Sequence, residues 1–144
     1  MNVKPAHRLP NRQDLTSWRR PYEQGCIVRI ELDFPPAELF PNRAKGTHWG
    51  KLYQLRSDYR EGSTWLAKHQ LKDWKHAGGD IRLTITFEMP DKRKRDADNC
   101  LAAAKGALDG LADAMFVNDQ FFQPILIYRN AGTKPGKLIV EIEQ

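Results

Sequence analysis

Two segments of the chain alternate apolar and polar residues at every second position. In the first, Val28, Ile30 and Leu32 alternate with charged residues until Phe34-Pro35-Pro36 interrupts the run. In the second, the alternation continues over residues 81–89. A period of two is the pattern of a strand with one buried face. The sequence therefore predicts one strand in each segment.

Apolar residues at helical spacing follow each of these strands. Over about residues 47–77, aromatic residues and leucines recur at roughly helical steps, and Gly78-Gly79 predicts the end of that helix. A second helix is predicted over about residues 98–109, with Gly110 as its C-terminal stop. Small side chains on its face would allow another helix or a second subunit to approach closely: Ala103, Gly106, Ala107 and Gly110.

The C-terminal part predicts two more strands, over residues 121–129, bent by Pro124, and around residues 138–142. The order strand, helix, strand, helix, strand, strand predicts an α+β fold. We expect a mixed β-sheet of about four strands with two main helices packed on it. Residues 1–25 are polar, basic and without a period, which predicts a flexible N-terminal arm before a domain over residues 26–144.

Composition narrows the class of protein. The formal net charge is +5, and residues 1–25 hold a disproportionate share of the excess. In the remainder, basicity therefore matters only where it clusters, and a basic cluster favours phosphate partners. The two cysteines have no metal-ligand spacing, and no apolar run has the length of a membrane span or a signal peptide. These features predict a cytoplasmic protein without a membrane anchor.

A basic run leads directly into two acids at the end of the second predicted strand. The acids are Asp96 and Asp98, two positions apart, and an asparagine follows them. The cations are read as contacts to a nucleic-acid backbone, and the alternative reading is an ordinary solvated loop. They are Lys92, Arg93, Lys94 and Arg95.

In an extended backbone, the side chains of Asp96 and Asp98 would share one face. Two carboxylates at that spacing suit a hard cation such as Mg²⁺, with Mn²⁺ as a possible substitute. The alternative is that Asp98 caps the following helix and Asp96 pairs with Arg95. A third acid, Asp119, lies in an Asn-Asp pair that is also ordinary turn chemistry. It joins the others only if the strand after it runs beside the strand before Asp96.

Two further residues are candidates for contacts to the substrate. Lys105 follows Asp98 by seven residues, which places both on about the same face of a helix. Its side chain could reach back toward the acids and bind the scissile phosphate, or it could be a surface lysine near Asp109. His48, beside Trp49, is read either as a contact to nucleic acid or as a packed residue.

The ordered set of these motifs resembles the RusA family of Holliday-junction resolvases. The segment 95–99, an Ala/Leu helix and the segment 116–120 occur in the family's order. Phe34-Pro35-Pro36, Pro41-Asn42 and Thr47-His48-Trp49 resemble the family's first strand, its Pro-Pro loop and the histidine at its first helix. The resemblance covers about residues 26–144.

The resemblance implies a homodimeric α+β endonuclease that uses Mg²⁺ and cuts branched DNA. It also implies Asp96, Asp98 and Asp119 as metal-binding catalytic carboxylates. The chain departs from the family pattern at two positions. Ala102 stands where the family usually has a catalytic lysine, for which Lys105 is a substitute, and Asn118 stands where the family often has an aspartate.

We therefore predict a Mg²⁺-dependent endodeoxyribonuclease that resolves four-way junctions in DNA recombination or repair. Asp96, Asp98, Asp119 and Lys105 are the predicted catalytic residues, with the basic run and His48 on the DNA backbone. Two other functions remain open at this stage. One is a DNA-binding module without catalysis, in which Asp98 is a helix cap, and the other is a metal-dependent nuclease that acts on RNA.

Overall fold

A computed structural model describes residues 27–132 and 134–144, and the predicted N-terminal arm lies outside these residues. Four strands form one mixed sheet in the order β1-β4-β2-β3. β4 pairs antiparallel with both β1 and β2, whereas β2 and β3 are parallel. The predicted α+β fold and mixed sheet are confirmed. The strands are β1 (Ile27–Asp33), β2 (Ile81–Met89), β3 (Phe122–Ala131) and β4 (Lys137–Glu143).

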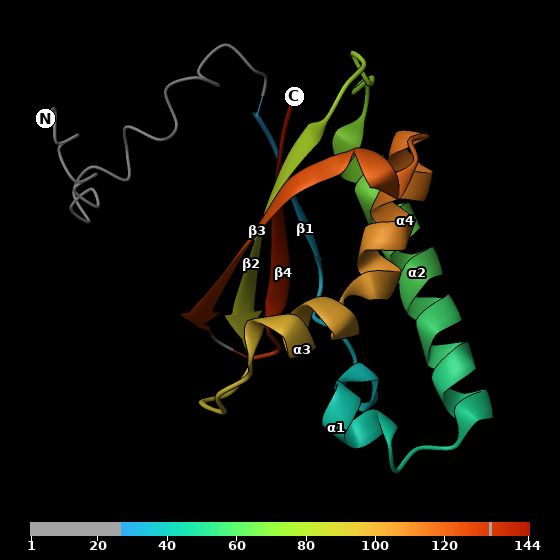
Figure 1. The fold of residues 1–144 in the computed structure, drawn as a ribbon, viewed down its shortest axis with the longest axis vertical. Coiled ribbons are helices and arrows are strands. Elements are labelled where there is room, and N and C mark those ends of the chain that lie inside the picture. Colours follow the sequence, from blue (N-terminus) through green and yellow to red (C-terminus); the bar gives the residue numbers. More distant parts are fainter. Residues whose placement is uncertain (1–26, 133) are drawn as a thin grey trace, which may run out of the picture.

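The helices pack on one face of this sheet (Figure 1). The longest two, α2 and α4, lie side by side along it, and α3 lies near the end of the sheet where β2 finishes (Figure 1). Within the described residues, no helix has both the length and the apolar character needed to cross a membrane. The α-helices are α1 (Pro41–Ala44), α2 (Trp49–Leu71), α3 (Ala97–Ala103) and α4 (Lys105–Met115), and the 3-10 helices are η2 (Ala37–Leu39) and η3 (Asp119–Phe121).

The core lies between the sheet and the helix pair. Leu83, Ile85 and Phe87 of β2 are fully buried, as is Leu111 of α4. The predicted alternation in β2 therefore identified the residues that face the helices. Burial of large apolar side chains like these is the main favourable contribution to folding.

Polar contacts fix α2 against the edge strand β1. The Tyr59 hydroxyl donates to the carbonyl oxygen of Asp33 at 2.8 Å. The Gln70 side chain accepts from the backbone N–H of Glu31 at 2.7 Å and donates to its carbonyl oxygen, also at 2.7 Å. The side chain of Gln70 thus forms hydrogen bonds with both backbone groups of Glu31. These bonds fix the position of α2 along the length of β1.

The first predicted helix was too long at its C-terminal end. It finishes at Leu71, because Lys72 adopts a positive φ of 49° that breaks the helical path. The glycines predicted as the stop lie in the turn that follows, where both have positive φ. At the other end, His48 caps the helix, and its Nδ1 accepts from the backbone N–H of Gly50 at 3.1 Å.

The second predicted helix is divided, and it extends beyond the predicted stop. α3 ends before Ala104, and α4 passes through Gly110 to Met115. The prediction that Gly110 ends the helix was wrong, because this glycine serves packing. A Cβ there would lie 2.5 Å from the carbonyl oxygen of Arg60 in α2. The close approach predicted for this small-residue face is confirmed, and the neighbour is a helix of the same chain.

Candidate active site

Lys105, the first residue of α4, lies between two carboxylates. Its Nζ is 2.5 Å from Asp109 Oδ1 and 3.1 Å from Asp119 Oδ2. The hydrogen bond that Lys105 donates to Asp109 is the main reason that the pKa of Lys105 is raised, and the hydrogen bond that it donates to Asp119 adds to the effect. The structure thus brings the predicted Lys105 and Asp119 together. Asp109 belongs to the same cluster, although the sequence analysis gave it no role beyond being close to Lys105.

A cavity of about 760 Å³ opens beside this cluster, between α2 on one side and α3 and α4 on the other. Asp98 of α3 and Lys105 of α4 both line it, and Asp109 joins them. The other lining residues are Leu39, Tyr53, Arg56, Ser57, Arg60, Leu101, Ala102, Ala103 and Gly106. This arrangement places an exposed carboxylate and an ammonium on one concave surface.

Asp98 is not the N-cap that the alternative interpretation required. It lies in the first turn of α3, and the N-cap position belongs to Asp96. Asp96 makes no side-chain capping hydrogen bond. A carboxylate in the first turn still interacts favourably with the positive end of the helix dipole. Asp98 therefore has a modest structural role without having its oxygens consumed by a cap.

Asp96 lies in different surroundings from Asp98. It contributes to two depressions on the surface, whose other lining residues include the basic run. Arg43 lines the first of these depressions, and Arg129 lines the second. Neither arginine was predicted as a site residue, because each is isolated in the sequence and only the fold brings it beside the run.

The three acids do not gather around one point. Among the described residues, no three histidine, cysteine or acidic side chains lie close enough together to hold one metal ion. The strand after Asp119 does run beside β2, but the two strands are parallel, with Ile81 opposite Phe122. Asp119 therefore lies near the beginning of β2, whereas Asp96 follows its end. The predicted three-carboxylate metal site does not fit this arrangement.

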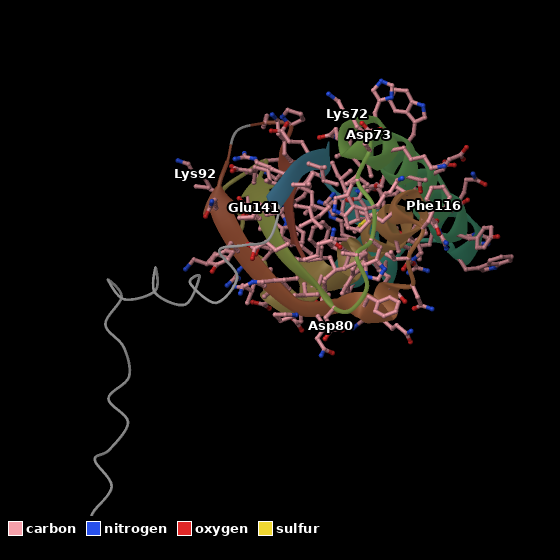
Figure 2. The ribbon with its side chains drawn as sticks, turned by 90° about the horizontal axis from the view of Figure 1, so that it is seen from above. Lys72, Asp73, Asp80, Lys92, Phe116 and Glu141 are labelled. Atoms are coloured by element: carbon pink, nitrogen blue, oxygen red, sulfur yellow. The ribbon has the colours of Figure 1, made fainter. Side chains whose placement is uncertain are left out.

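The four cations of the basic run differ in their contacts. Arg95 forms a two-point ion pair with Asp91, at 2.8 and 3.1 Å, and its guanidinium lies over the rings of Phe34 and Phe40. The alternative pairing of Arg95 with Asp96 was wrong. Lys92, Arg93 and Lys94 are exposed. Figure 2 shows Lys92 and Phe116, which precedes the Asp119 turn, on opposite sides of the molecule.

His48 is exposed and lies outside the cavity that holds Asp98. Its ring is 5.6 Å from that of Trp49, and Nδ1 is engaged by the helix cap. A capping role requires only one ring nitrogen, so Nε2 can still interact with a ligand. The predicted contact to DNA stays a prediction.

The comparison with known proteins is decisive for the family. A family model described as "Endodeoxyribonuclease RusA" matches residues 20–143. The match includes the segment between β2 and α3 that contains Asp96 and Asp98, as well as the turn that contains Asp119. This chain belongs to the RusA family. The resemblance noted in the sequence is thereby confirmed, and the match begins before residue 26, where the domain was predicted to start.

A curated relative comes from a bacteriophage. The "Crossover junction endodeoxyribonuclease rusA" of Enterobacteria phage HK97 is 35% identical to this RusA-family chain over 65 residues. The aligned part is 44% of this chain and 52% of the phage protein. The chain thus spans about half the length of that relative.

For this RusA-family chain, the Lys105–Asp109 pair is the site feature that sequence reasoning used least. The two residues are four apart, a spacing that places side chains next to each other on a helix. The sequence predicts this pairing as an alternative to a functional role of Lys105. In the structure the pairing with Asp109 and the contact to Asp119 occur together, so the two readings are compatible.

Proposed function

We propose that this RusA-family protein is an endodeoxyribonuclease that cuts four-way DNA junctions. The observation that carries the proposal is the match to the RusA family model over residues 20–143. The printed name of the phage HK97 relative supports a junction substrate. The cavity that contains Asp98 and Lys105 supports hydrolytic chemistry, because it combines an acceptor for a water proton with a cation for a phosphate.

In this proposal, Lys105 binds the scissile phosphate. The ammonium has three donors, and Asp109 and Asp119 accept two of them. A phosphate oxygen can take the third, and negative charge that develops on it during attack is then stabilised by a preoriented cation. Asp98 accepts a hydrogen bond from the attacking water across the cavity, which orients it toward phosphorus.

We also propose that cleavage requires Mg²⁺, for which Mn²⁺ substitutes. The support is the family resemblance together with the carboxylates of Asp98, Asp109 and Asp119 at or near the cavity, because Mg²⁺ and Mn²⁺ prefer oxygen ligands. The described arrangement does not assemble the predicted three-acid site. The requirement for metal is therefore proposed for the reaction as a whole, and no catalytic step is assigned to it.

A homodimer is the third part of the proposal, and its support is likewise the family resemblance. A two-fold dimer would present two equivalent sites, which matches the symmetry of paired cuts across a junction. The exposed Lys92, Arg93 and Lys94 would hold the DNA backbone without reading its sequence. Arg43 and Arg129 extend this basic surface beyond the run.

A cleavage assay on four-way, forked and linear DNA tests the proposal. We expect the wild type to cut the four-way junction with Mg²⁺ and to stop in chelator. Asp98→Asn and Lys105→Ala should each lower the cleavage rate by roughly 100-fold or more, since each removes a group that acts on the reacting atoms. Junction binding, measured by electrophoretic mobility shift, should persist in Asp98→Asn.

Asp73→Asn is the matched control, because it removes an exposed carboxylate from the loop after α2 (Figure 2). It should cut like the wild type. If the wild type and Asp98→Asn both bind junctions and neither cuts, the protein is a DNA-binding module and the proposal fails. Preferential cutting of an RNA hairpin over a DNA junction would reject the proposed substrate.

A further inference from the structure

The cavity beside Asp98 has an apolar part and a charged part, and only the charged part is used by the proposed chemistry. We propose that the apolar part receives one unstacked nucleotide of the DNA substrate. This inference rests on the proposed function and deepens it, because it says how the site selects branched DNA. The apolar lining consists of Leu39, Leu101, Ala102 and Ala103.

The dimensions and lining of the cavity suit a nucleotide. Its volume of about 760 Å³ lies within the range of sites that enclose small ligands, roughly 300–1,000 Å³. A nucleobase has two apolar faces, and Leu39 or Leu101 can cover one of them. Tyr53 also lines the cavity and is 70% exposed, so its ring is free for a base to stack on. Aromatic rings accept any base in this way, because every base has a π-face.

The charges of the lining indicate where the phosphate of that nucleotide lies. Arg60 is paired with Asp113 at 2.7 Å, and Lys105 is paired with Asp109 and Asp119. Arg56 lines the same cavity, is exposed, and forms no ion pair within the described residues. Its guanidinium therefore has donors available for two phosphate oxygens, a geometry that arginine favours.

The two acids in the cavity lead to the same placement. Asp98 and Asp109 repel a phosphate that approaches α3 and α4 without contacting a cation. A phosphate held by Arg56 on the α2 side avoids them. The base then points toward Leu101 and Ala102, and the next phosphate along the strand lies near Lys105, where cleavage is proposed.

A nucleotide pocket would favour branched DNA on energetic grounds. Taking a base out of a duplex requires breaking its stacking and pairing, and the cost is least where the base is already poorly stacked. Bases at the exchange point of a four-way junction have lost part of their stacking, whereas bases inside a linear duplex have not. The pocket therefore discriminates by the cost of exposing a base, with no reading of base identity.

Fluorescence of 2-aminopurine tests this inference, because the base brightens when it leaves the stack. We place it at each position flanking the exchange point and add wild-type protein in chelator, so that binding is observed without cleavage. We expect the fluorescence to rise at one position on each strand that is cut. Tyr53→Ala should weaken junction binding roughly tenfold, because it removes the ring on which the base stacks.

Ala102→Phe provides an independent variant. Ala102 is exposed and lines the cavity, so a phenyl ring there fills the space without entering the core. It should abolish the fluorescence rise. Trp65→Ala is the matched control, because Trp65 is a 63% exposed aromatic on the same helix that does not line the cavity. Circular dichroism and thermal melting show whether each variant is folded.

The possible outcomes separate this inference from the proposed function. If the wild type cuts junctions but no position brightens, or if Tyr53→Ala and Ala102→Phe behave like Trp65→Ala, the nucleotide pocket is wrong and the endonuclease stands. If the wild type neither binds nor cuts junctions, the proposed function is wrong and the pocket inference is rejected with it.

Discussion

At the scale of single residues, Arg95 shows that the basic run is not uniform. Its side chain is only 16% exposed, and it pairs with Asp91 while its guanidinium lies over two phenylalanine rings. The other three cations of the run face solvent. The charge pattern of the sequence could not distinguish Arg95 from the other three cations. Its partner Asp91 lies four residues earlier, and only the turn of the loop brings the two side chains together. Arg95 fixes this loop, and Lys92, Arg93 and Lys94 are exposed and available for the proposed contacts to DNA.

The Asp91–Arg95 pair predicts a specific dependence of stability on pH. The hydrogen bonds from Arg95 and from the backbone of Arg93 lower the pKa of Asp91 from 3.8 to about 2. A carboxyl whose pKa is lowered in the folded state stabilises the fold above its unfolded pKa, and this stabilisation is lost as the pH falls toward the folded pKa. The loss therefore occurs between about pH 4 and pH 2.

Asp91→Asn should remove this contribution. We expect the variant to be less stable than the wild type at pH 7 and to lose less stability between pH 4 and pH 2, since asparagine does not ionise. Urea unfolding at a series of pH values measures both effects. Asp73→Asn, which alters an exposed loop acid, should follow the wild-type curve. If the free energy of unfolding of Asp91→Asn and of the wild type changed with pH in parallel, the Asp91–Arg95 pair would not be the source of the pH dependence.

At the scale of elements, Gly110 lies where α4 approaches the backbone of α2 most tightly among the glycines of α4. A Cβ at Gly110 would lie 2.5 Å from the Arg60 carbonyl oxygen and 3.0 Å from the Thr64 backbone nitrogen. Both are backbone atoms of α2, so only a shift of the helices could make room. We expect Gly110→Ala to lower the free energy of unfolding by about 1–3 kcal/mol, the usual cost of overpacking.

Gly62 is the matched control within the same pair of helices. It lies in the middle of α2, and a Cβ there would meet nothing within 4 Å. Gly62→Ala should raise the free energy of unfolding by about 0.5–1 kcal/mol, because alanine is the better helix former. Chemical denaturation gives both values. If the two substitutions change stability in the same direction, close packing at Gly110 is not what sets its identity.

The same elements show what local sequence patterns can predict. Alternation located β1, β2 and β4, because a strand with one buried and one exposed face has apolar and polar residues at alternate positions. The limits of the helices were less predictable. Gly110 was read as a stop because glycine commonly follows a helix, but here a neighbouring helix required the missing side chain. That requirement comes from tertiary packing, and it is not present in the helix's own sequence.

At the scale of the whole molecule, sheet topology determines which predicted site residues meet. Lys105 and Asp98 were predicted on one face of a single helix, and both line the cavity although they belong to the separate helices α4 and α3. The gathering of Asp96 with Asp119 depended on the direction of β3. Since β3 is parallel to β2, the two acids belong to different ends of that strand pair. Strand direction was not readable from the sequence.

This separation leads to a prediction about Mg²⁺. The residues that the structure describes bring no three acids around one point, so they offer few oxygens to one ion. Mg²⁺ commonly binds through one or two carboxylates together with phosphates of the substrate. We therefore expect divalent cations to bind the free protein weakly and the junction complex at least about tenfold more tightly. Electron paramagnetic resonance of Mn²⁺, with and without a four-way junction, measures the difference.

Variants show which acids contribute to that binding. Asp98→Asn and Asp119→Asn should reduce Mn²⁺ binding in the junction complex, and Asp73→Asn should not. Cleavage during the measurement leaves the phosphates in the product complex, so the gain in affinity should survive it. Tight binding to the free protein that needs Asp96, Asp98 and Asp119 together would mean that the acids come together in solution. In that case the arrangement around Lys105 described above would be a state that metal rearranges before DNA arrives.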